Sequence, residues 1–264
     1  MPLLPSGLYV DERGAAPERA DLVVLIHGSM DRGPSFSRVV SRLSDLWVLT
    51  YDRRGYHRSR QAVPLAHTLD EHVDDLFAVL AGRHAVAAGH SYGGAMALTA
   101  AWRRPEQIRA VVAYEPPAPW LPWWPTRSAG GSAAGARGPE DAAESFMRRM
   151  IGDARWERLP ERTRARRRDE GHALIAEMAS MRDGGAPFDP TGVSVPTVIA
   201  RGELSLPHHR RGVEVLADLV PGAELVEVEG AGHGAHLTHP DAFAAIVRRA
   251  LERSGLDNDG RRGR

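Results

Sequence analysis

Cysteine and lysine are both absent from the 264 residues of this chain. Without cysteine there can be no disulfide, no thiolate nucleophile, and no iron–sulfur or thiolate zinc site. Without lysine the chain cannot carry a P-loop lysine, a Schiff-base lysine or a lysine general base. The two absences exclude several classes of enzyme and leave serine, histidine and carboxylate side chains as the main groups available for catalysis.

Net charge and long apolar runs are lacking as well. The basic and acidic residues number 34 each, so no overall field attracts nucleic acid or anionic lipid, and we expect neither as a partner. No apolar run approaches the roughly 18 to 20 residues of a membrane span, and the first five residues do not resemble a signal peptide. We therefore expect a cytoplasmic protein that makes no membrane contact.

The pentapeptide Gly-His-Ser-Tyr-Gly is centred on Ser91, between an apolar run at 84–88 and a helical pattern at 95–102. A strand that turns this sharply into a helix forces the serine into strained backbone angles, and the two glycines leave room for the neighbouring backbone. The hydroxyl would then stand at the helix N-terminus, where backbone N–H groups favour a negatively charged oxygen. The pattern predicts a nucleophile elbow, with a flexible glycine-rich turn as the alternative.

Three further motifs occur in a fixed order around this turn. A buried-strand pattern at 22–26 ends in His27-Gly28, a second at 46–51 leads into Asp52-Arg53-Arg54-Gly55, and a Gly-Ala-Gly-His loop precedes the last helix. The whole pattern resembles the α/β-hydrolase superfamily, from about residue 7 to residue 253. The resemblance implies an α/β fold with a mostly parallel, twisted sheet, helices on both faces and an inserted helical cap.

The change in composition after residue 115 sets the expected domain boundaries. Prolines, tryptophans and helical patterns replace the alternation of strand and helix there, and strand texture returns at 195–202. We therefore expect residues 1–115 and 191–254 to form the hydrolase core and residues 116–190 to form the helical cap. The polar residues 255–264 are expected to be a disordered tail. The short segment before residue 22 leaves room for one antiparallel edge strand, near residues 7–10.

A serine nucleophile needs a base, and the base needs a carboxylate to orient it. His233 follows the last strand, which is where the superfamily carries its base. The usual aspartate would stand at position 205, but this chain has Ser205. Haloalkane dehalogenases and fungal zearalenone lactonases take their acid from the end of the sixth strand, and residues 112–116 are similar to theirs. Glu115 is therefore favoured as the acid, and Glu203 remains the alternative.

The resemblance also implies roles for residues around the serine. The backbone N–H groups of Ser29 and Tyr92 would hold the oxyanion, whereas His27 and Asp52 are expected to be structural. Met30 and the cap tryptophans are expected to line an apolar substrate pocket, namely Trp120, Trp124 and Trp156. The alternative for the tryptophans is that they only pack the cap onto the core.

Histidines at 233, 236 and 239 are spaced three apart, which raises the question of a metal site. There is no His-Glu-x-x-His helix and no carboxylate between them, so we expect no metal and no other cofactor.

The sequence predicts a serine hydrolase that cleaves a small-molecule carboxylic ester or lactone through an acyl-enzyme on Ser91. Serine at this position argues against dehalogenation and epoxide hydrolysis, which in this superfamily use a carboxylate nucleophile. The alternative is a non-hydrolytic ligand-binding or cyclase-like protein with the same fold. The sequence leaves the oligomeric state and the identity of the substrate open.

Overall fold

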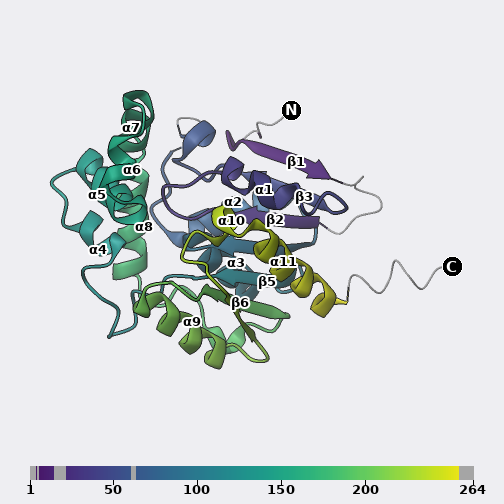
Figure 1. The fold of residues 1–264 in the computed structure, drawn as a ribbon. Coiled ribbons are helices and arrows are strands. Elements are labelled where there is room, and N and C mark those ends of the chain that lie inside the picture. Colours follow the sequence, from purple (N-terminus) through teal and green to yellow (C-terminus); the bar gives the residue numbers. More distant parts are fainter. Residues whose placement is uncertain (1–3, 5, 15–21, 61–63, 256–264) are drawn as a thin grey trace.

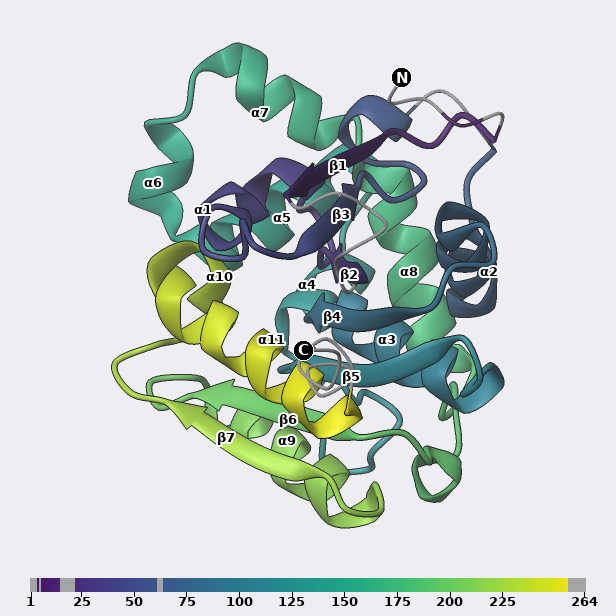
Figure 2. The same ribbon diagram turned by 90° about the vertical axis from the view of Figure 1, so that its right-hand side faces the viewer.

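The structure is a computed structural model that describes residues 4, 6–14, 22–60 and 64–255. Its strands form one sheet of order β1-β3-β2-β4-β5-β6-β7, which runs from top to bottom of Figure 2. Strand β1 is antiparallel to β3, and the remaining neighbours are parallel. The strands are β1 (Val10–Gly14), β2 (Leu22–Ile26), β3 (Trp47–Tyr51), β4 (Ala85–His90), β5 (Ile108–Tyr114), β6 (Thr197–Gly202) and β7 (Glu224–Val228).

Strand β2 shows why the apolar runs in the sequence are continuous. Every residue of β2 is buried, because successive side chains point to opposite faces and helices cover both faces. Leu22, Val24 and Ile26 pack in one cluster with α2 (Leu69–Leu80), α3 (Tyr92–Arg103) and α9 (Pro207–Leu219). Val23 and Leu25 pack on the other face with α1 (Ser37–Val40) and α11 (Pro240–Ser254). The predicted fold class is confirmed.

The chain between β5 and β6 is helical and adds no strand to the sheet. Its main helices are α4 (Ala129–Ala134), α5 (Pro139–Ile151), α6 (Asp153–Glu157), α7 (Glu161–Arg168) and α8 (Gly171–Asp183). They gather beside one end of the sheet, in teal at the left of Figure 1. Phe146, Trp156 and Leu174 are buried together in an apolar cluster of this region. We call the region the cap, and its status as a separate domain stays a prediction.

Two local expectations differ from the structure. The glycine, alanine and serine residues of the stretch 127–138 favour a loop. Helix α4 nevertheless forms there, because the Ser128 hydroxyl caps it by accepting a hydrogen bond from Gly131 N at 3.2 Å. The edge strand lies at Val10–Gly14 instead of 7–10, since Val10 pairs with Tyr51 of β3.

Residues 256–264, most of the predicted tail, lie outside the described residues. No helix in the described part of the chain is both long and apolar enough to cross a membrane.

Candidate active site

Ser91 stands between β4 and α3 in backbone angles that few non-glycine residues adopt. Its φ is 55° and its ψ is −122°, and Tyr92 is the first residue of α3. A Cβ on Gly89 would lie 2.0 Å from the carbonyl oxygen of Gly93, and one on Gly93 would lie 2.2 Å from that of Ile26. The close approach of these backbones therefore requires both glycines, and the turn has the geometry of a nucleophile elbow.

Glu115 follows β5, whose last residue pairs with the residue before Ser91 in β4. The Glu115 backbone also has a positive φ, 45°, and its side chain is fully buried. Oxygen Oε2 accepts a hydrogen bond of 2.6 Å from Nδ1 of His233. Oxygen Oε1 accepts hydrogen bonds from the backbone N–H of Gly202, at 2.8 Å, and from the hydroxyl of Ser205.

These contacts keep the Glu115 carboxyl group ionised. Burial by itself raises the pKa of Glu115. The hydrogen bond and the charge of His233, together with the hydrogen bonds from Gly202 and Ser205, lower this pKa by more than burial raises it, so the net pKa lies below its ordinary value. A carboxylate that accepts from Nδ1 fixes the proton of a neutral His233 there and leaves the lone pair on Nε2, as a general base requires.

Glu203, the other carboxylate that the sequence left open, lies elsewhere. Its side chain is exposed, and Oε2 accepts a hydrogen bond of 2.8 Å from the backbone N–H of Gly230. Of the two carboxylates, the structure brings Glu115 to His233.

Two other histidines surround His233. Nε2 of His90 donates to the carbonyl oxygen of His233 at 2.8 Å, and the two ring centroids are 4.7 Å apart. His209 belongs to α9, and the centroid of its ring lies 4.5 Å from that of the His233 ring. Burial, with a smaller contribution from neighbouring histidines, lowers the pKa of His90 and of His209 well below the ordinary value. Both rings are therefore neutral near pH 7.

His27 and Asp52 have structural contacts. Nδ1 of His27 donates to the Gly28 carbonyl at 2.8 Å and Nε2 accepts from the Arg53 N–H at 2.9 Å. Burial and the charge of Arg53 lower the pKa of His27 to about 3, so the ring is neutral. Asp52 accepts hydrogen bonds from the Gly33 N–H at 2.9 Å and from Nε of Arg58 at 2.6 Å, which hold the turn after β3.

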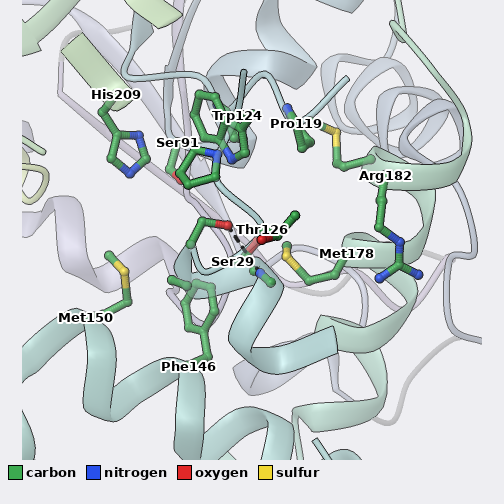
Figure 3. Close-up of a pocket in the computed structure, with 17 residues that line it drawn as sticks. Ser29, Ser91, Pro119, Trp124, Thr126, Phe146, Met150, Met178, Arg182 and His209 are labelled. Atoms are coloured by element: carbon green, nitrogen blue, oxygen red, sulfur yellow. Dashed lines mark hydrogen bonds between the residues drawn. The ribbon is translucent and has the colours of Figure 1, made fainter. Parts of the chain in front are cut away.

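A cavity of about 370 Å³ lies between the elbow and the cap. Ser29 and Ser91 line it, and Figure 3 shows Phe146 and Met150 across from His209 and Trp124. Most of its lining is apolar, which is typical of a small-molecule site. Its other lining residues are Pro117, Pro119, Pro125, Thr126, Ser128, Ala129, Gly130, Gly131, Met178, Met181 and Arg182.

Of the four residues expected to bind substrate, Trp124 lines this cavity and the other three lie elsewhere. Trp156 is fully buried in the apolar cluster of the cap, which also contains Met30. Trp120 packs edge-on against Phe188 at 6.3 Å. The positions of Trp120 and Trp156 agree better with the alternative for the tryptophans, in which they only pack the cap onto the core.

Sequence reasoning missed several cavity residues. The sequence pattern assigns neither His209 nor the cap methionines to a substrate pocket. Phe146 and Met150 are four residues apart on α5, and Met178 and Met181 are three apart on α8. The helical spacing shows that each pair shares a face, but which face meets the cavity depends on contacts between distant segments.

The three evenly spaced histidines do not converge. His236 contacts Asp31 at 3.1 Å through Nε2, and His239 contacts the Thr238 hydroxyl at 2.9 Å. In the described residues, two other sets do bring possible ligand atoms within 4.8 Å of one another, namely Asp31, His90 and His236, and Glu115, His209 and His233. The absence of a bound metal stays a prediction.

The model of the alpha/beta hydrolase family matches residues 23–246, which is most of the chain and includes the elbow, Glu115 and His233. The chain belongs to the alpha/beta hydrolase family.

Several proteins to which the chain is similar are named as hydrolases. The chain is 27% identical to 2-(acetamidomethylene)succinate hydrolase of Mesorhizobium japonicum, over 93% of this chain and 91% of that protein. It is 34% identical to Lipase LipV of Mycobacterium tuberculosis over 41% of each chain. The enol-lactonase from Burkholderia xenovorans LB400 has a similar structure, with a TM-score of 0.71, 25% identity, and coverage of 93% of this chain and 96% of that one. The chain spans less than half the length of several curated relatives that it matches.

Proposed function

We propose that this member of the family is a serine hydrolase that cleaves a small-molecule carboxylic ester or lactone in the cytoplasm, through an acyl-enzyme on Ser91. The observation that carries the proposal is the 2.6 Å hydrogen bond between His233 Nδ1 and Glu115 Oε2, beside the cavity that Ser91 lines. The nucleophile, the base, the acid and the oxyanion donors all come from the chain, so the reaction needs no cofactor.

In the first step, the Ser91 oxygen attacks the carbonyl carbon of the substrate and its proton passes to Nε2 of His233. The carbonyl oxygen becomes an oxyanion, which the backbone N–H groups of Ser29 and Tyr92 hold, each worth on the order of 3 kcal/mol. Glu115 stabilises the imidazolium of His233 while it carries the proton. The carbon–oxygen bond of the leaving group then breaks, and the leaving oxygen takes the proton from His233.

In the second step, water attacks the acyl-enzyme and gives a proton to His233 as it does so. The second tetrahedral intermediate collapses, the Ser91 oxygen regains the proton, and the carboxylic acid leaves. With a lactone, the alcohol stays attached to the acyl chain, so one product forms instead of two.

The relatives support this class of substrate. One structural neighbour is named an enol-lactonase and one curated relative is named a lipase, and both names denote cleavage of an ester bond. The apolar lining of the cavity, with Phe146, Met150 and Trp124, favours an apolar acyl or aryl group.

A fluorophosphonate probe tests the proposal directly, because it forms an adduct only with an activated serine. We expect intact mass spectrometry to show one adduct on the wild type and none on Ser91→Ala. A screen of p-nitrophenyl esters and of lactones, with Ser91→Ala as the blank, then identifies the preferred substrate. A folded wild-type protein that neither forms the adduct nor cleaves any of these substrates would favour the non-hydrolytic alternative.

A further inference from the structure

Glu177 of cap helix α8 is a buried carboxylate that reaches into the core of the fold. It is 1% exposed, and both of its oxygens are used. Oε1 lies 2.5 Å from Nη1 of Arg53, and Oε2 accepts hydrogen bonds from the hydroxyls of Ser29, at 2.6 Å, and Tyr56, at 2.9 Å. Three of the groups in this cluster therefore come from the core, and the cap supplies the negative charge.

The cluster contains one buried positive charge, on Arg53, and one buried negative charge, on Glu177. Arg53 is also fully buried, with its guanidinium between the rings of Tyr56 and Tyr92, at 5.0 and 4.7 Å from their centroids. His72 Nε2 is 3.5 Å from Glu177, but burial and then the charge of Arg53 lower its pKa well below the ordinary value, so it is neutral. Removing the charge of Glu177 would leave Arg53 buried without a counter-ion, which is strongly unfavourable.

Arg53 holds the backbone of the loop that follows β2. Its Nε donates to the carbonyl oxygen of His27 at 2.9 Å, and its Nη2 donates to that of Gly28 at 3.0 Å. The C=O of Gly28 and the N–H of Ser29 belong to one planar peptide unit and point in opposite directions. A guanidinium that fixes this C=O therefore also fixes the direction of the Ser29 N–H.

Glu177 acts on the same peptide from two sides. It fixes the Arg53 guanidinium through Oε1, and through Oε2 it holds the side chain of Ser29 itself. The hydroxyl of Ser29 is thereby occupied, although Ser29 also lines the cavity.

We propose that Glu177 is a positioning residue for the oxyanion hole, which it assembles from the cap by fixing the peptide between Gly28 and Ser29. The inference rests on the proposed function, in which the Ser29 N–H holds the oxyanion. According to this inference, the cap has a second role besides enclosing the substrate, because the carboxylate that fixes the direction of the Ser29 N–H comes from cap helix α8 and not from the core.

The variant Glu177→Gln keeps the size of the side chain and removes its charge. Removing an oxyanion donor outright lowers kcat by about 10²- to 10³-fold, so we expect misplacing one to lower kcat by about tenfold to a hundredfold. KM should stay within about twofold, because the donor acts on charge that develops only in the transition state. A trifluoromethyl ketone, which forms an oxyanion adduct with serine, should bind more weakly by a similar factor, whereas a carboxylic acid product should bind as to the wild type.

Ser180→Ala is the matched control. Ser180 lies one turn after Glu177 on α8, and its hydroxyl accepts a hydrogen bond of 2.9 Å from the N–H of Leu69 in the core. The control therefore weakens the contact of the same helix without touching the oxyanion loop. We expect its kcat and its ketone affinity to stay within about twofold of the wild type.

Three outcomes of these measurements would overturn the inference. An active wild type with Glu177→Gln equal to it in kcat and ketone binding overturns the inference and leaves the proposed function standing. Equal losses in Glu177→Gln and Ser180→Ala also overturn it, since the cause would then be general loosening of the cap. A wild type that fails both the fluorophosphonate and the ester assays overturns the proposed function and the inference with it.

If circular dichroism shows that Glu177→Gln does not fold, Ser29→Ala replaces it. That variant keeps the backbone N–H and the buried ion pair, and loses only the bond to Glu177. A typical hydrogen bond is worth about 1 kcal/mol, so we expect kcat to fall about fivefold, with a matching loss of ketone affinity. Wild-type behaviour of Ser29→Ala would overturn the inference.

Discussion

The hydroxyl of Ser205 donates a hydrogen bond to the carboxylate of Glu115. Ser205 stands after β6, where many members of the superfamily would carry the aspartate that orients the base. The side chain at position 205 therefore still contacts the site, because it donates a hydrogen bond to the carboxylate that follows the neighbouring strand β5. The ends of β5 and β6 therefore meet through this hydrogen bond, beside the contact between Glu115 and His233.

The Glu115 carboxylate should matter far more than that of Glu203. Glu115→Gln should lower kcat by about 10³- to 10⁴-fold with little change in KM, since the charge acts on an imidazolium formed in the transition state. Glu203→Gln, which alters an exposed side chain, should stay within about threefold of the wild type. Steady-state kinetics with a p-nitrophenyl ester measure both. Similar losses in the two variants would contradict the assignment of Glu115.

Returning a carboxylate to position 205 should partly rescue the loss of the one at 115. In the double variant Glu115→Gln with Ser205→Asp, we expect at least about a tenfold gain in kcat over Glu115→Gln alone, because a charge again lies near His233. Ser205→Asp alone should lower the melting temperature, since two carboxylates in contact cannot both ionise cheaply. No gain in the double variant would show that only the β5 position can orient the base.

Asp52 should contribute to stability in a manner that depends on pH. Burial raises its pKa, but the hydrogen bonds from Arg58 and Gly33 and the charge of Arg58 outweigh burial and hold the pKa below the ordinary 3.8. The folded state therefore binds this proton more weakly than the unfolded state, so the contribution is complete above about pH 4 and falls as acid titrates the folded carboxylate.

Asp52→Asn should lower the free energy of unfolding by about 2 kcal/mol at pH 7 and flatten its decline below pH 4. Urea unfolding of both proteins between pH 3 and pH 7 measures the difference. A parallel decline in wild type and variant would mean that Asp52 is not the source of this acid sensitivity.

Gly130 should limit the size of the acyl group that the cavity accepts. A Cβ at this position would lie 2.6 Å from Sδ of Met178, the flexible end of a side chain that also lines the cavity. Gly130→Ala should push Met178 into the cavity and lower kcat/KM for p-nitrophenyl octanoate by about tenfold, while the acetate ester is little affected. Gly135→Ala, where the new Cβ meets nothing closer than 3.8 Å, is the control.

The parts of the site that sequence could predict are those held by local backbone geometry. The elbow at Ser91 follows from the two glycines and the flanking patterns, and the buried strands follow from their continuous apolar runs. Glu115 and His233 were placed through the resemblance to a family. The choice between Glu115 and Glu203 remained open because it depends on how β5 meets the loop after β7, a contact between residues 118 positions apart.

The cap could be predicted as helical but not in its packing. Trp156 and Trp124 belong to the same aromatic-rich segment, yet one is buried within the cap and the other lines the cavity. Glu177 reads in the sequence as one more polar residue of a helical segment. Its role depends on Arg53, which lies 124 positions away, and no local pattern records that pairing.

His57 lies in the turn after β3 with a φ of 45°, an angle that glycine adopts more readily than residues with a side chain. A side chain at such an angle costs of order 1 kcal/mol that glycine would avoid, and its contact of 3.1 Å with Asp52 offsets part of that cost. The backbone conformation of His57 thus lowers the stability of the fold at a point close to the cap, where His57 N also donates a hydrogen bond to Glu170 at 3.0 Å. A substitution that relieves this strain should raise the stability of the protein, and it would alter neither Ser91 nor Glu115.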